Sequence, residues 1–91
     1  MSVERRRVFY SGRVQGVGFR FISQRLAREF QVSGSVRNLA DGRVELIVQA
    51  DAEVVSSYLR AISRELAGKI HTVHDEAEPV TDLHERDFTI R

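Results

Sequence analysis

The sequence predicts an α+β sandwich, in which two helices pack on one face of a mostly antiparallel sheet of four to five strands. Three observations predict it. Apolar residues recur at helical spacing in two segments. Stretches rich in β-branched and aromatic residues precede, separate and follow these segments. An Asp-Gly pair, Asp41-Gly42, marks a hairpin between two of the stretches. With 91 residues, of which 42% are hydrophobic, the chain is expected to form a single domain over residues 1–91.

The first two elements are expected to be a strand over Val8–Val14 and a helix over Arg20–Phe30. The strand segment is rich in β-branched and aromatic residues. The helix is amphipathic, because its apolar residues recur on one face and charged residues occupy the other. The face expected to be buried holds Ile22, Leu26, Ala27 and Phe30, and the exposed face holds Arg25, Arg28 and Glu29.

The next two strands are expected to form a hairpin, with Val32–Leu39 and Arg43–Ala50 on either side of the Asp-Gly turn. In the second of these strands apolar and polar residues alternate. This alternation predicts one buried face and one face exposed to solvent.

A second helix is expected to begin after an N-cap at Asp51 and to end at Gly68. Lys69–Ala77 is then expected to be a strand with a bulge or an irregular start. The reason is that its apolar residues would not all lie on the same face of a regular strand. A loop over Glu78–Glu85 follows, and Phe88 and Ile90 suggest a short final strand. The predicted buried stripe of the second helix is Val55, Leu59, Ile62 and Leu66.

This order of elements is that of the split βαβ, ferredoxin-like sandwich. Because a helix carries the chain back between the first and second strands, these two strands are expected to run in the same direction. Their carboxyl ends, near Val14 and near Asn38, are then expected at the same edge of the sheet.

Charge is distributed unevenly along the chain. Residues 1–43 contain nine arginines and three acidic residues (net +6), whereas residues 44–91 contain five basic and ten acidic residues (net −5). Only Lys69 among the basic residues is a lysine. Arginine suits bidentate contact with phosphate or carboxylate. An anionic partner is therefore expected to meet the first half of the chain.

Composition also excludes several classes of protein. The absence of cysteine excludes disulfides and cysteine-ligated metal sites. No apolar run approaches the roughly 20 residues of a membrane span, and the charged start of the chain is not followed by the apolar stretch of a secretory signal. We therefore expect a cytoplasmic protein that does not enter a membrane.

The segment between the first strand and the first helix is the strongest candidate for a binding site. It consists of Gln15, Gly16, Val17, Gly18 and Phe19. Its glycines permit backbone conformations that point successive N–H groups into one concavity, where an anion binds. The following helix adds the positive end of its dipole, and Arg20 adds a guanidinium suited to phosphate oxygens. Judged on spacing alone, a plain structural turn is an equal alternative, because neither the P-loop nor the dinucleotide-binding motif is matched.

Asn38 is the second candidate, because the topology places it beside this loop. Its amide offers a donor and an acceptor without charge, so it can orient a water molecule that attacks a bound electrophile. The alternative is a turn-forming asparagine ahead of a hairpin.

The remaining candidates favour structural interpretations. The histidines are expected to be surface residues rather than metal ligands, since two of them face opposite ways on one strand. Two serines lack the flanking pattern of a nucleophile. The basic run Arg5–Arg7 is expected to be a solvated strand entrance, and the phenylalanines are expected in the core. These residues are His71, His74 and His84, Ser11 and Ser23, and Phe9, Phe19, Phe21, Phe30 and Phe88.

Two motifs resemble the signatures of the acylphosphatase family. Gly12–Arg20 is similar to the first signature, Gly34–Glu45 to the second, and Phe88–Arg91 to the C-terminal pattern. The resemblance implies a ferredoxin-like fold and hydrolysis of the carboxyl–phosphate bond of acyl phosphates without metal or organic cofactor. It implies that the loop cradles phosphate through its backbone amides, that Arg20 holds the phosphate, and that Asn38 positions the attacking water.

The resemblance also sets expectations about partners. They are an acyl phosphate substrate, inorganic phosphate as product and competitive inhibitor, no nucleic acid, no membrane and a monomeric state. Two alternatives stay open. One is a non-catalytic module on the same fold that binds RNA or a small ligand, although the third strand lacks the exposed aromatic residues of RNA readers. The other is an acylphosphatase-like domain of a larger carbamoyl-transfer enzyme.

Overall fold

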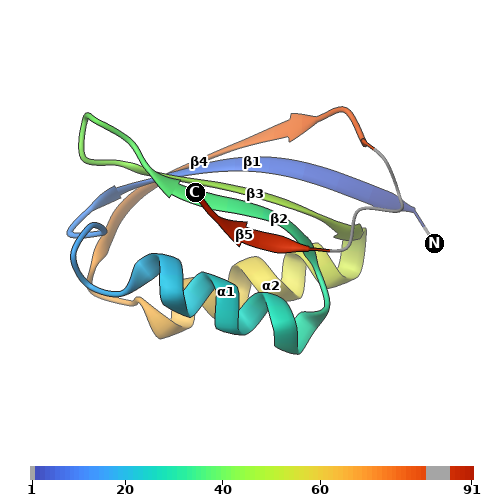
Figure 1. Ribbon diagram of the computed structural model, residues 1–91, viewed down its shortest axis with the longest axis horizontal. Helices are drawn as coiled ribbons and strands as arrows, with labels where there is room; N and C mark the ends of the chain where they lie inside the picture. Colours follow the sequence, from blue (N-terminus) through green and yellow to red (C-terminus); the bar gives the residue numbers. More distant parts are fainter. Residues whose placement is uncertain (1, 82–86) are drawn as a thin grey trace.

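Two helices cover one face of a five-stranded sheet, as the computed structural model of the chain shows (Figure 1). The structure describes residues 2–81 and 87–91. The elements are β1 (Val3–Gly12), α1 (Phe19–Phe30), β2 (Ser33–Asn38), β3 (Val44–Asp51), α2 (Ala52–Glu65), β4 (Ile70–Glu78) and β5 (Phe88–Ile90).

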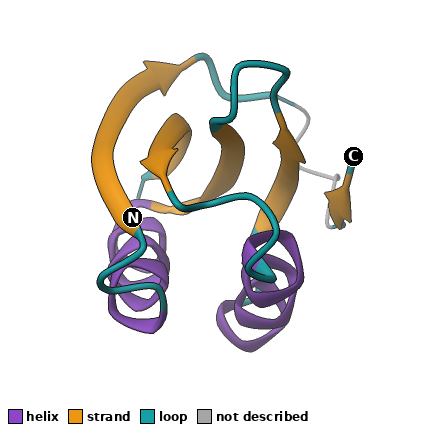
Figure 2. Ribbon diagram, turned by 90° about the vertical axis from the view of Figure 1, so that its left-hand side faces the viewer, coloured by secondary structure: helices purple, strands orange, loops and turns teal. Residues whose placement is uncertain are grey.

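The strand order in the sheet is β4-β1-β3-β2-β5. β1 pairs antiparallel with β3 and β4, β2 pairs antiparallel with β3, and β2 pairs parallel with β5. β1 and β2 therefore run in the same direction, as predicted, and both end at the same edge of the sheet. Figure 2 shows the two helices side by side on one face and the other face left open. The predicted ferredoxin-like α+β sandwich is confirmed.

The core lies between the helices and the inner face of the sheet. One aromatic contact links the sheet to the helices, and one hydrogen bond links the helices to each other. The rings of Tyr10 and Phe19 lie 4.8 Å apart, and the buried Tyr58 hydroxyl of α2 donates a 2.9 Å hydrogen bond to the carbonyl of Ser23 in α1. The other large and fully buried side chains are Leu46, Ile62, Leu66, Val8, Val14, Val36, Val44 and Val48.

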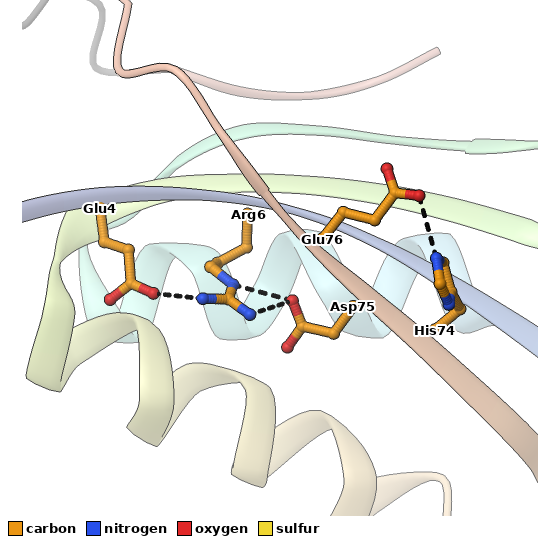
Figure 3. A network of polar contacts seen from close by, with 5 residues as sticks. All are labelled: Glu4, Arg6, His74, Asp75 and Glu76. Carbon is orange, nitrogen blue, oxygen red and sulfur yellow. Dashed lines mark hydrogen bonds and ion pairs between the residues drawn. The ribbon is translucent and has the colours of Figure 1, made fainter.

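The first strand begins five residues earlier than predicted, at Val3, and ends at Gly12 instead of Val14. The basic run therefore lies inside the strand and is not a solvated entrance. The Arg6 guanidinium lies 2.7 Å from both Glu4 and Asp75, as Figure 3 shows, and Arg7 lies 2.7 Å from Glu78. The positive first half of the chain is thus partly neutralised by the acidic β4.

β3 is buried on both faces, so the predicted exposed face is wrong. Glu45 is 4% exposed, Ile47 7% and Gln49 5%. Arginine side chains of neighbouring strands contact two of these residues, Glu45 and Gln49. The guanidinium of Arg37 is 2.9 Å from the Glu45 carboxylate and that of Arg7 is 3.9 Å from it.

The helices bury stripes that differ slightly from the predicted ones. In α1 the buried residues are Phe19, Ser23, Leu26 and Ala27, while Ile22 and Phe30 are half-buried. In α2 Tyr58 is buried in place of Leu59, which is half-buried. A residue three positions after Val55 lies as close to its face as one four positions after it, and the larger aromatic ring fills the space between the helices.

The predicted N-cap of α2 and the irregular start of β4 are confirmed, but α2 ends at Glu65 and not at Gly68. Gly68, with a φ of 86°, lies in the turn that follows the helix. The Asp51 carboxylate accepts a hydrogen bond from the N–H of Glu53, which makes Asp51 the N-cap. The pairing of β1 with β4 shifts register at Ser11–Gly12, at the start of β4. The short final strand is also confirmed as β5. Of the loop predicted over Glu78–Glu85, Glu78 belongs to β4, and residues 82–85 lie outside the described residues.

Candidate active site

Two glycines of the loop between β1 and α1 have left-handed backbone conformations, which occur in anion-binding nests. Gly16 has a φ of 76° and Gly18 a φ of 81°, in the left-handed region where residues with side chains are strained. A Cβ atom added at either position would meet no atom within 4 Å. The space next to these two glycines is therefore open, and their backbone is accessible to a ligand.

The N-terminus of α1 faces this space without a side-chain cap. Gly18 is its N-cap residue, and no side chain accepts a hydrogen bond there. The first helical N–H to donate to a main-chain carbonyl at this end is that of Ile22, which bonds to Gly18 at 2.9 Å. The N–H groups of the first turn are thus available to an anion, and the helix dipole adds positive potential.

A cavity of about 250 Å³ at this end of the molecule is lined by most of the predicted site residues. Arg20 and Asn38 both line it, and both side chains are exposed to solvent. They line the same cavity because β1 and β2 run in the same direction, so that the loop after β1 and the last residue of β2 lie at one edge of the sheet. The lining residues are Val14, Gly16, Gly18, Phe19, Arg20, Phe21, Asn38 and Ile90.

Three of the loop residues predicted to bind phosphate line this cavity and two do not. Gly16, Gly18 and Phe19 line it. Val17 instead packs against the hydrophobic core. Gln15 has another role that its position in the sequence did not reveal. Its side-chain Nε2 donates hydrogen bonds of 2.8 Å to the carbonyl of Leu39 and 3.0 Å to that of Arg43, at the start and end of the β2–β3 turn.

The charges around the cavity favour an anionic ligand. Of the described residues that line it, Arg20 alone is charged. The carboxylate of Asp41, in the β2–β3 turn, does not line the cavity and accepts hydrogen bonds from the N–H and the guanidinium of Arg43, at 3.1 and 2.9 Å. These hydrogen bonds lower the pKa of Asp41. The arrangement suits the binding of a phosphate, and its described lining offers no pair of carboxylates for acid–base catalysis.

Three residues that line the cavity, the buried Val14 and the exposed Phe21 and Ile90, were not predicted as site residues. Phe21 was expected in the core, but it is 67% exposed, because it follows Phe19 by two positions and so points away from the buried face of α1. Ile90 of β5 is 41% exposed. Phe9 also lies outside the core, on the open face of the sheet, where the Arg43 guanidinium stacks 4.7 Å above its ring.

The other weak candidates are not brought into this site. His71 and His74 are exposed on β4, and the His74 ring lies 2.9 Å from Glu76 (Figure 3), while His84 lies outside the described residues. No cluster of three metal-binding side chains occurs in residues 2–81 and 87–91. Ser23 is buried and its hydroxyl donates to the carbonyl of Phe19, a structural role.

A larger cavity of about 900 Å³ lies at the opposite end of α1, where Phe30, Gln31 and Val32 contribute to its wall. None of the predicted site residues lines it. Neither described helix is long and apolar enough to cross a membrane.

Comparisons with known proteins point to one family. The acylphosphatase family model matches residues 6–90. The chain is 40% identical to an acylphosphatase from Methanospirillum hungatei over 83 residues. This alignment covers 89% of each of the two sequences. It superposes on the crystal structure of an acylphosphatase from Bacillus subtilis with a TM-score of 0.86 and 30% identity, over 99% of each chain. It also matches 12% of the length of full-length HypF with a TM-score of 0.84, where 21% identity shows a shared fold alone.

Proposed function

The chain belongs to the acylphosphatase family, and on this premise we propose that it hydrolyses the carboxyl–phosphate bond of acyl phosphates. The observation that carries the proposal is that Arg20, the glycines of the β1–α1 loop and Asn38 line one cavity. Water adds to phosphorus, the bond between phosphorus and the carboxyl oxygen breaks, and the products are a carboxylate and inorganic phosphate.

The phosphoryl group is bound by main-chain donors and one guanidinium. The N–H groups around Gly16 and Gly18 and the uncapped first turn of α1 surround its oxygens, and Arg20 donates a fork of two hydrogen bonds. Each charge-assisted hydrogen bond contributes about 1.5–3 kcal/mol. Several of them together hold a phosphate dianion and stabilise the charge that develops on its oxygens during transfer.

Asn38 positions the attacking water. Its amide oxygen accepts a hydrogen bond from the water and fixes it opposite the leaving carboxylate, at the far side of the phosphorus from the P–O bond that breaks. Phosphoryl transfer depends mainly on such positioning and on charge stabilisation. An uncharged amide suits this task, because a carboxylate in the same place would repel the phosphate dianion.

Proton transfer needs no further side chain. An acyl phosphate dianion and water give a carboxylate and a dihydrogen phosphate anion, so both protons of the water end on phosphate. A phosphoryl oxygen of the substrate accepts the proton that the attacking water loses. The leaving carboxylate is stable as an anion, so it requires no strong general acid. This scheme is consistent with the lack of a carboxylate in the described lining of the cavity.

The direct test is the hydrolysis of benzoyl phosphate in the presence of a metal chelator, with inorganic phosphate added as inhibitor. We expect metal-independent turnover and competitive inhibition by phosphate. A protein that leaves benzoyl phosphate intact under all conditions would contradict the proposed activity. Activity that disappears with chelator and returns with a divalent cation would contradict the metal-free mechanism.

A further inference from the structure

Two large apolar side chains stand exposed beside the charged end of the candidate site. Phe21 is 67% exposed and Ile90 is 41% exposed, and both line the cavity that Arg20 and Asn38 line. Isolated exposed apolar residues are common on protein surfaces. Phe21 and Ile90 are not isolated, because both line one small cavity together with the glycines of the β1–α1 loop.

Their positions follow from two different elements. In β5, Ile90 pairs in parallel with Val36 of β2, and Asn38 follows Val36 by two positions. Ile90 and Asn38 therefore lie on the face of the sheet that the helices cover, at the end where β2 stops. Phe21 approaches from the first turn of α1, immediately after Arg20. The cavity is thus bounded by a polar part and by two apolar side chains from α1 and β5.

These two parts match the two ends of an acyl phosphate. Its phosphoryl group is a dianion, and its acyl group is joined to the same phosphorus through one oxygen. A phosphate held by the loop and Arg20 leaves the acyl group to extend along the cavity wall. Burial of apolar acyl surface against Phe21 and Ile90 is favourable, because it removes apolar surface of both partners from water.

On the basis of the proposed function, we propose that Phe21 and Ile90 contact the acyl group and make the site selective for acyl phosphates with an aromatic acyl group over acetyl phosphate. The two residues act on specificity and take no part in bond breaking. Neither is needed to fill the core, since α1 buries its opposite face and both side chains remain exposed.

The test compares Phe21→Ala, Ile90→Ala and the double variant with the unmodified protein on benzoyl phosphate and acetyl phosphate. The measured quantity is the ratio of kcat/KM for the two substrates, because this ratio cancels their common chemistry. We expect the ratio to fall on the order of tenfold in the double variant, mainly through a higher KM for benzoyl phosphate. Phe21→Leu should restore part of the ratio, since leucine keeps an apolar contact.

Val73→Ala is the matched control, because Val73 is 51% exposed on β4 and does not line the cavity. It should leave the ratio unchanged. If the double variant also leaves the ratio unchanged, the assigned contact is wrong, although the protein still hydrolyses acyl phosphates.

A binding experiment separates this inference from the proposed activity. The dissociation constants of benzylphosphonate and methylphosphonate are measured by NMR titration, so that no hydrolysis is required. Tighter binding of benzylphosphonate, lost in the double variant, supports the acyl contact even if benzoyl phosphate is not hydrolysed. Equal affinities, or an advantage of benzylphosphonate that survives in the double variant, would overturn it whatever the turnover assay gives.

Discussion

The side chain of Gln15 is hydrogen-bonded to the main-chain carbonyl of Leu39 at 2.8 Å. The same Nε2 atom donates to the carbonyl of Arg43 at 3.0 Å, and the N–H of Leu39 donates to that carbonyl at 2.8 Å. Leu39 directly follows Asn38. One side chain of the β1–α1 loop therefore fixes the turn that begins just after Asn38, the residue proposed to position water, and it couples the two halves of the proposed site.

This coupling predicts that Gln15 is a positioning residue. Gln15→Met removes both hydrogen bonds at similar side-chain length, and Gln15→Glu places a carboxylate against two carbonyl oxygens. We expect kcat to fall by about ten- to a hundredfold, more in Gln15→Glu, because small displacements of a positioned group slow transfer strongly. KM and phosphate inhibition should change less in Gln15→Met than kcat does.

Gln24→Met is the control for this prediction, since Gln24 also donates to a distant carbonyl, that of Phe88 at 3.3 Å, and does not line the cavity. It should lower the melting temperature about as much as Gln15→Met without the loss of kcat. Parallel losses of stability and kcat in both variants would show that the Gln15 contact is merely structural.

Asn38→Ala separates binding from turnover. The substitution removes the amide that is proposed to orient water but leaves Arg20 and the loop amides in place. We expect the inhibition constant of phosphate to stay near its original value, while kcat for benzoyl phosphate falls on the order of a hundredfold or more. Asn38→Asp should weaken phosphate binding as well, because it places a negative charge in the cavity. Near-normal turnover of Asn38→Ala would show that another group positions the water.

Arg20→Lys tests whether the guanidinium acts by its shape or by its charge alone. Lysine keeps the positive charge but cannot form two parallel hydrogen bonds to one phosphate. We expect strongly reduced phosphate affinity and kcat/KM in Arg20→Lys, and a further loss in Arg20→Gln. Thermal stability should hardly change, since the side chain is exposed.

Arg28→Gln serves as the control for Arg20→Gln, because it removes an exposed arginine from the last turn of the same helix. It should leave phosphate affinity intact. Arg20→Lys with full activity would mean that a point charge is sufficient at this position.

The sequence was sufficient to predict what depends on chain order and local pattern. Helical periodicity and the Asp-Gly turn gave the arrangement of strands and helices, and the parallel direction of β1 and β2 then placed Asn38 beside the glycine loop. Backbone features such as the positive φ of Gly16 also follow from residue type.

Contacts between side chains of distant elements could not be predicted in this way. Gln15 reaches carbonyl groups 24 and 28 positions away, and Glu45 of β3 is buried because arginines of two neighbouring strands cover it. Both depend on the register of the sheet, which the pattern of apolar residues did not specify for polar side chains. Phe21 was placed in the core because an aromatic residue is usually buried there, whereas its position on α1 points it toward the cavity mouth.

The two tyrosines of the chain give a prediction for alkaline pH. Tyr10 and Tyr58 are 1% and 0% exposed, and burial is the main cause that raises the pKa of both phenols well above the ordinary value of about 10. The folded protein keeps both protonated, whereas an unfolded chain loses these protons above about pH 10. Their contribution to stability is therefore complete below that pH and decreases as pH rises further.

We accordingly expect no tyrosinate absorbance from the folded protein as pH is raised past about 10, followed by ionisation of both residues together with loss of the circular dichroism signal. In concentrated urea the same groups should titrate near the ordinary value. Tyr58→Phe should halve the absorbance change, and it should also lower the free energy of unfolding by about 1 kcal/mol, because the hydrogen bond to the carbonyl of Ser23 is lost. A gradual tyrosinate signal near pH 10 with unchanged circular dichroism would mean that one of the phenols is open to water in the folded state.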